Sequence, residues 1–124
     1  MSWATIKAEP LELGPALQRD DALYYLFQLP IIRDGRLSFP VLFRNPERAL
    51  VLRFRTTRSK IRGLIRLIDN QWICEWAATG KYAPANLRLI GARFAIGDTI
   101  GLRPIGGTLS LFRVAEHSPP LIAA

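Results

Sequence analysis

The clearest strand pattern of the chain is ALVLRFRTTRSKIRGLIRLIDNQWICEWA, residues 49–77. Side chains of a β-strand point alternately to opposite faces, and this stretch alternates apolar and basic residues in two consecutive runs. The runs predict strands over 49–56 and 60–68, and Asp69-Asn70 predicts a turn into a third strand, QWICEWA. We therefore expect a three-stranded antiparallel meander at the centre of the chain.

The alternation predicts one apolar face and one basic face for this meander. The expected core-facing residues are Leu50, Leu52, Phe54, Ile61, Ile65 and Leu67. The expected solvent-facing residues are Arg53, Arg55, Arg62 and Arg66. Arginine carries a planar fork of donors that matches phosphate oxygens and the major-groove edge of guanine. The basic face therefore fits a polyanion, and the alternative is the solvated outer surface of a basic protein.

Composition limits the partners of the chain. Its 124 residues are the size of one domain, which can bury a core without disulfides or metal. The 17 basic residues outnumber the 10 acidic ones, which gives a net charge of +7. This excess favours nucleic acid or anionic lipid over an acidic protein as the partner.

Cysteine usage and hydropathy indicate the compartment. The single cysteine, Cys74, cannot form an internal disulfide and lies in an apolar run, so we expect a buried, unreactive thiol in a reducing compartment. No apolar run is long enough to cross a bilayer, and the first residues lack the apolar core of a secretory signal. We therefore expect a cytoplasmic chain without a membrane partner.

The first third of the chain predicts few regular elements. Residues 1–22 are expected to be irregular apart from a short helix over about 14–21. The segment LYYLFQL, residues 23–29, alternates as a strand does, and Pro30 is expected to end its pairing.

Glycine-containing dipeptides predict two tight turns. The Asp-Gly pair at 34–35 lies between apolar residues and predicts a hairpin with Arg33 and Arg36 at its tip. The Gly-Gly pair at 106–107 predicts the turn of a closing hairpin, whereas residues 86–94 fit a helical turn or a strand equally well. Many short strands with regular turns indicate a mainly-β or barrel fold.

The residues that catalysis needs are scarce. His117 is the only histidine and follows the last expected strand, so one cysteine and one histidine cannot form the usual four-ligand metal site. The carboxylates are scattered rather than clustered, and the glycine-rich segment 97–107 lacks the Lys-Ser/Thr pair of a phosphate-binding loop. We expect the chain to be no enzyme and to hold no cofactor or metal.

Two motifs resemble the B3-like DNA-binding domain, a family known from plant transcription factors and from the recognition domains of restriction endonucleases. GRLSFP, residues 35–40, is similar to the GRLxIP-like segment that follows the family's first arm. FAIGD, residues 94–98, is similar to the segment that precedes its last two strands. The resemblance covers about residues 23–114, with 115–124 as a tail or linker. It implies a seven-stranded open pseudobarrel with one or two short helices. The arginine-containing first arm is closer to the bacterial restriction type than to the lysine-rich plant type.

The family grips duplex DNA with two arms that enter the major groove. The resemblance implies a first arm of Arg33, Asp34, Gly35 and Arg36. It implies a second arm of Asp69, Asn70, Gln71 and Trp72. Arginine can bind guanine, and asparagine or glutamine can bind adenine, although aspartate and asparagine are also ordinary turn residues. Phosphate contacts then go to Arg53, Arg55, Arg58, Lys60, Arg62 and Arg66.

These observations predict a sequence-specific duplex-DNA recognition domain, the target-recognition part of a restriction endonuclease whose nuclease centre lies in a fused domain. Two alternatives stay open. A PUA-like RNA-binding barrel would expose aromatic rings for base stacking, for which Trp3, Tyr24 and Tyr82 are the candidates. An interaction barrel without a nucleic-acid partner would use its charge only for solubility.

Overall fold

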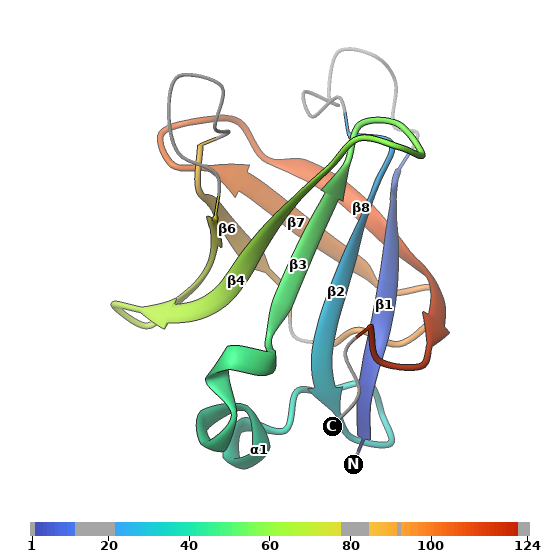
Figure 1. The fold of residues 1–124 in the computed structure, drawn as a ribbon, viewed down its shortest axis with the longest axis vertical. Helices are drawn as coiled ribbons and strands as arrows, with labels where there is room; N and C mark the ends of the chain where they lie inside the picture. The colour runs from blue at the N-terminus through green and yellow to red at the C-terminus, as the bar shows by residue number, and fades with distance from the viewer. Residues whose placement is uncertain (1, 12–21, 78–84, 92, 122–124) are drawn as a thin grey trace.

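The computed structural model describes residues 2–11, 22–77, 85–91 and 93–121. Its strands form a closed antiparallel barrel in which each strand pairs with its neighbours in sequence and the last pairs with the first (Figure 1). The strands are β1 (Ser2–Pro10), β2 (Tyr24–Ile31), β3 (Leu50–Phe54), β4 (Lys60–Ile68), β5 (Gln71–Trp76), β6 (Leu87–Ile90), β7 (Thr99–Pro104) and β8 (Ser110–Ser118). Between β2 and β3 lie the helix α1 (Phe39–Arg44) and a short 3-10 turn, η1 (Pro46–Arg48).

The mainly-β class is confirmed, but the expected open barrel of seven strands is wrong, because eight strands close the sheet. The closing strand is β1, which pairs with β2 on one side and with β8 on the other. Residues 2–10 are therefore not irregular, and β8 extends the barrel beyond residue 114 to Ser118. The helix expected over 14–21 lies outside the described residues.

Alternate residues of the strands fill the barrel with apolar side chains. The largest fully buried rings are those of Tyr25, Phe27, Phe94 and Phe112. The phenol of Tyr25 meets the ring of Phe112 edge-on, with centroids 5.2 Å apart. The buried side chains form one continuous apolar cluster, so the polar and charged groups that could bind a ligand lie mainly on the outside of the barrel.

The central meander is confirmed. β4 pairs with β3 and β5 in antiparallel register, and its bounds are those expected from the sequence. Asp69 and Asn70 have positive φ angles of 50° and 62°, as a tight turn between two twisted strands requires. On β5, Cys74 and Trp76 lie on the same side of the strand, and both are buried in the core.

Two predictions in the neighbourhood of β2 fail in part. Pro30 does not end the strand, because it lies opposite Trp3 of β1 in a part of β2 that has no partner on the β3 side. Proline is tolerated at such an edge. The turn at 34–35 forms, since the N–H of Gly35 donates to the Ile32 carbonyl, but it leads through a single bridge into α1 rather than into a second hairpin strand.

The closing hairpin forms where the sequence predicts it. The turn at 106–107 joins the paired strands β7 and β8. The segment 86–94, for which the sequence allowed a helical turn or a strand, contains the strand β6. Gly106 has a φ of 78°, a conformation that suits glycine.

The barrel has two distinct ends because successive strands run in opposite directions. One end, here called the α1 end, carries the connections over 32–49, 69–70 and 93–98. The opposite end, here called the far end, carries the turns over 55–59 and 105–109 (Figure 1). Among the described residues, no helix is long and apolar enough to cross a membrane.

Candidate nucleic-acid interface

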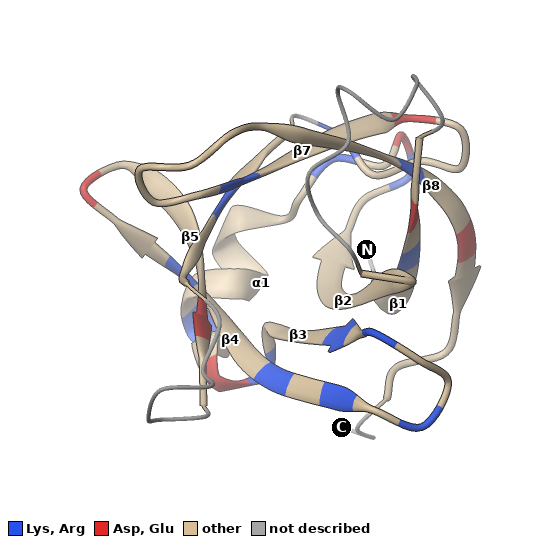
Figure 2. Cartoon of the chain, turned by 90° about the horizontal axis from the view of Figure 1, so that it is seen from above, with Lys and Arg blue, Asp and Glu red and all other residues tan. Residues whose placement is uncertain are grey.

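The outer surface of β4 carries the basic face that the sequence predicts. Alternation directs Gly63 and Ile65 inward, where both are buried, and Arg62 and Arg66 outward, where both are exposed. Lys60 continues the outward row toward the far end. Basic residues form successive bands along β4 and its turn with β3 (Figure 2). The outward orientation of Arg62 and Arg66 is thus as expected.

Two arginines that the sequence analysis did not select extend this face around the barrel. Arg66 lies opposite Ile73, Ile73 opposite Arg88, and Arg88 opposite Arg103, on β4, β5, β6 and β7. Ile73 is on the outer side of the sheet yet only 7% exposed. Arginine stems commonly cover apolar neighbours while the guanidinium stays in water. Stems of the arginines on either side can provide this cover, so that their charged groups share one surface.

The charges in this row are only partly compensated. Arg66 Nη1 donates to Glu75 Oε1 at 3.1 Å. Arg88 and Arg103 form no ion pair with any described residue. Side chains directly opposite on antiparallel strands have Cβ atoms about 5 Å apart, and like charges there destabilise the sheet. A bound anion would relieve this repulsion.

We use the name outer basic face for Lys60, Arg62, Arg66, Arg88 and Arg103. Only the first three could be selected from the sequence, because an obvious alternation of basic and apolar residues marks β4. Arg88 and Arg103 stand alone in their strands, and only the register of β6 with β7 brings them together. The pairing of two distant arginines is not visible in either strand's own pattern.

Arg53 does not belong to this face, and its predicted orientation is wrong. It lies opposite Tyr25, whose ring is in the core, and Arg53 Nε donates to Tyr25 Oη at 3.1 Å. The reason is that β3 is apolar on both faces. Val51 fills the core, while Leu50 and Phe54 are buried on the outer side, Phe54 by stacking on Tyr24 at 4.6 Å. The alternation of apolar and polar residues therefore gave no basis for deciding which face of β3 points into the core.

Arg55 and Arg58 lie in the turn between β3 and β4 at the far end. The N–H of Arg55 donates to the Ser59 carbonyl, and Thr56 Oγ1 accepts from the N–H of Arg58, so the turn is well defined. Both side chains are exposed. β4 has nine residues and is thus about 30 Å long, which separates this turn from everything at the α1 end.

The predicted first arm is a turn held against the barrel. The N–H of Phe94 donates to the Gly35 carbonyl, and a Cβ on Gly35 would lie 2.7 Å from the Ala95 nitrogen. Arg33 and Arg36 are exposed, and Arg36 Nε lies 3.2 Å from Asp34 Oδ2. The turn thus presents two guanidinium groups at the α1 end, one of them already paired with a carboxylate.

The predicted second arm is the tip of the β4–β5 hairpin, which also lies at the α1 end (Figure 1). The side chains of Asp69, Asn70 and Gln71 are exposed there. Trp72 is different, because its ring is partly buried against the core and stacks on α1. The structure therefore brings both predicted arms to one end of the barrel, but it separates them from Arg55 and Arg58.

Aromatic residues on α1 form a surface that the sequence analysis missed. Phe39 and Phe43 are 47% and 58% exposed, and both rings lie close to Trp72. The candidates chosen from the sequence fit stacking less well. Arg48 covers the ring of Trp3 at 4.5 Å, Tyr24 lies between Lys7 and Phe54, and Tyr82 is outside the described residues.

Groups with catalytic potential are dispersed. The described residues contain no cluster of three or more histidine, cysteine, aspartate or glutamate side chains. His117 is exposed but lies in β8, not beyond it, and its Nε2 donates to the Phe94 carbonyl at 2.6 Å. Cys74 is fully buried as expected, and burial raises the pKa of its thiol to about 12.

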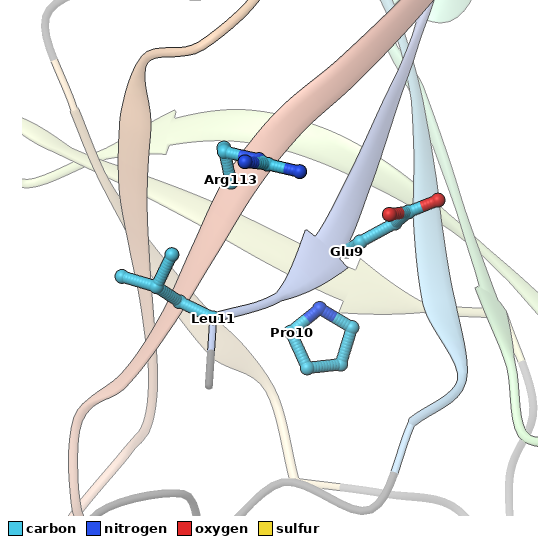
Figure 3. A pocket seen from close by; sticks show the side chains of 4 residues that line it. All are labelled: Glu9, Pro10, Leu11 and Arg113. Atoms are coloured by element: carbon cyan, nitrogen blue, oxygen red, sulfur yellow. The ribbon is translucent and has the colours of Figure 1, made fainter. Parts of the chain in front are cut away.

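A hollow of about 350 Å³ lies beside the end of β1 (Figure 3). Glu9, Pro10, Leu11 and Arg113 line it. The carboxylate of Glu9 is 3.5 Å from Lys7 Nζ and is therefore already paired. The hollow thus offers no second acidic or nucleophilic group among its described lining residues, and the outer basic face is the better candidate site.

Comparison of the chain with protein-family models, with characterised proteins and with solved structures finds no match. The candidate interface therefore rests on the geometry of this barrel alone.

Proposed function

We propose that this barrel binds nucleic acid, and specifically duplex DNA, through the outer basic face. The observation that carries the proposal is the row in which Arg88 and Arg103 lie directly opposite each other without a carboxylate partner among the described residues. A phosphodiester between them would accept hydrogen bonds from both guanidinium groups and remove their repulsion.

The dimensions of the face support a duplex. The distance along β4 from Lys60 to Arg66 is about 20 Å, because each residue of a strand advances about 3.3 Å. The major groove of B-DNA is about 12 Å wide. Basic side chains spread over this length, and over β6 and β7, can reach phosphates on both sides of the groove.

The two turns at the α1 end supply the proposed base contacts. Arg33 and Arg36 on one turn and Asn70 and Gln71 on the other are exposed and have the donor and acceptor patterns that read guanine and adenine. Arg55 and Arg58 lie in the turn at the far end, so they take no part in the proposed base contacts. The B3-like family remains a prediction from the two sequence motifs.

The proposal extends to the protein that would contain this barrel. The chain is a cytoplasmic target-recognition domain without catalytic activity of its own, and a fused nuclease domain would complete a restriction endonuclease. DNA is its only proposed macromolecular ligand, and it needs neither cofactor nor metal to bind.

A matched pair of variants tests the face. Arg103→Gln and Arg113→Gln each remove one exposed arginine from the outer side of neighbouring strands, β7 and β8. In a fluorescence-anisotropy titration with duplex DNA, Arg103→Gln should weaken binding and lower the salt slope by about one unit, because one phosphate contact is lost. Arg113→Gln should bind as the unaltered chain does. Equal effects of the two substitutions would contradict a localised interface.

The arms need a different readout. If Arg33 and Arg36 read base edges, replacing either by alanine should cost about 1 to 3 kcal/mol on the preferred site and relax the preference at one position in a randomised-duplex selection. A uniform loss on all sequences would show that this turn attracts DNA without reading it.

A further inference from the structure

Three aromatic rings form an exposed surface at the α1 end, here called the aromatic platform: Phe39, Phe43 and Trp72. The ring centroids of Phe39 and Phe43 are 5.9 Å and 6.5 Å from that of Trp72, with interplanar angles of 27° and 19°. The rings of Phe39 and Phe43 are 6.2 Å apart and tilted by 32° to each other. The three rings thus form one compact aromatic cluster, in which the two phenylalanine rings are exposed.

The sequence of α1 explains why this surface is exposed. Residues four apart lie on the same side of a helix, so Phe39 and Phe43 share one side while Leu42 packs into the core. Leu67, the cross-strand partner of Trp72 on β4, is 41% exposed and extends the apolar area. Exposed apolar patches that combine several large side chains commonly mark a binding site.

The surroundings of the platform are basic and rich in amide groups. Arg44 ends α1 and is exposed. The exposed amide side chains of Asn70 and Gln71 lie at the tip of the β4–β5 hairpin, just before Trp72 in the sequence. Flat aromatic rings next to guanidinium and amide groups suit a base with its phosphate, since every base has a face that can stack.

We infer that the aromatic platform binds unpaired nucleotides, whose bases stack on Phe39 and Phe43 while Arg44 contacts a phosphate. This inference rests on the proposed function and makes it more specific. The preferred ligand is a duplex with an adjacent single-stranded segment, the duplex lying on the outer basic face and the unpaired bases on the platform.

Two ligands and two variants test this. The ligands are a blunt duplex and the same duplex with a four-nucleotide single-stranded thymidine extension, compared by fluorescence anisotropy. Phe43→Leu keeps an apolar side chain but removes the ring, whereas Phe43→Trp keeps a ring that can stack. We expect the unaltered chain and Phe43→Trp to bind the extended duplex about tenfold more tightly than the blunt one, because only the extended duplex has an unpaired base to stack on the ring. Phe43→Leu should lose this preference and still bind the blunt duplex normally.

The possible failures are distinguishable. Equal binding of both ligands by the unaltered chain would overturn the inference and leave the proposed function in place. Failure to bind either ligand at low salt would overturn both. An equal loss of preference in Phe43→Leu and Phe43→Trp would contradict stacking.

Two further measurements establish that the variants are folded and that the platform is free in solution. Thermal unfolding of both variants shows whether the barrel is intact. Sedimentation of the unaltered chain without nucleic acid tests whether the platform is instead covered by a second copy, and self-association that Phe43→Leu abolishes would contradict the inference.

Discussion

Arg53 acts on the stability of the barrel rather than on its charged surface. Its Nε–H donates to the hydroxyl of Tyr25, whose ring is fully buried, at a position where β2 and β3 lie opposite each other. A hydrogen bond from a charged donor to a partly buried acceptor contributes more to the free energy of unfolding than an exposed ion pair does.

We expect Arg53→Ala to lower the free energy of unfolding by about 1 to 2 kcal/mol. Arg58→Ala, in the exposed turn of the same hairpin, should change it by less than about 0.5 kcal/mol. Chemical denaturation of the two variants measures both values. If the two substitutions prove equally mild, Arg53 would be a surface residue after all.

Cys74 gives a pH dependence whose sign follows from burial. The folded state holds the thiol proton up to a pKa of about 12, whereas the thiol of the unfolded chain titrates near the ordinary value of 9.0. The unfolded state therefore releases this proton first as the pH rises, so the Cys74 contribution lowers the free energy of unfolding between pH 9 and 12. The contribution is constant below pH 9.

The difference between the unaltered chain and Cys74→Ala isolates this effect from the titration of other groups. Their difference in free energy of unfolding should be independent of pH from 6 to 8 and should change in favour of Cys74→Ala above pH 9. A constant difference throughout would mean that the thiol is not buried in the folded state.

Among the elements, β4 both joins β3 to β5 in the barrel wall and carries most of the outer basic face. Gly63 allows β4 to approach β5 closely, because a Cβ at this position would lie 2.5 Å from the Glu75 carbonyl oxygen and 3.0 Å from the ring of Trp76. The backbone of β5 cannot withdraw without breaking its pairing with β4.

Gly63→Ala should therefore lower the free energy of unfolding by about 1 to 3 kcal/mol, as overpacking of a core does. The adjacent, exposed Arg62→Ala serves as the control and should be nearly neutral. Thermal unfolding followed by circular dichroism compares them. A neutral Gly63→Ala would show that β4 and β5 can separate at this point.

The elements that sequence could predict are those marked by local signals. β4, β5 and the β7–β8 hairpin combine alternation with turn residues such as Asn70 and Gly106, and all three formed as expected. β1 was missed because its inward residues include the small Ala4 and Ala8, and because its partner β8 lies about a hundred residues away. A pattern within a few neighbouring residues cannot predict that two strands so far apart in the sequence pair.

The same limit applies to the candidate site. Arg62 and Arg66 could be selected because β4 alternates clearly, whereas the inner face of β3 was misassigned because both of its faces are apolar. The pairing of Arg88 with Arg103 depends on strand register, and the exposure of Phe43 depends on where α1 lies. Both are tertiary properties that a single sequence does not display.

At the scale of the whole molecule, the closed barrel acts as a rigid support with different surfaces. The outer basic face follows β4, β6 and β7, and the α1 end carries the two turns and the aromatic platform. Because the described strands close into a barrel, most of their backbone groups are paired within the sheet and little strand edge is left for a partner chain. Side chains must therefore make the contacts to a ligand, and charge is the property that distinguishes this surface.

The salt dependence of duplex-DNA binding tests the central claim most directly, because each phosphate contact releases condensed counterions. With the five residues of the outer basic face each holding one phosphate, the logarithm of the affinity should fall against the logarithm of the salt concentration with a slope of roughly 4 to 5. The double variant Arg88→Gln, Arg103→Gln should reduce this slope by about two units. A slope near zero in the unaltered chain, or an unchanged slope in the double variant, would contradict the account.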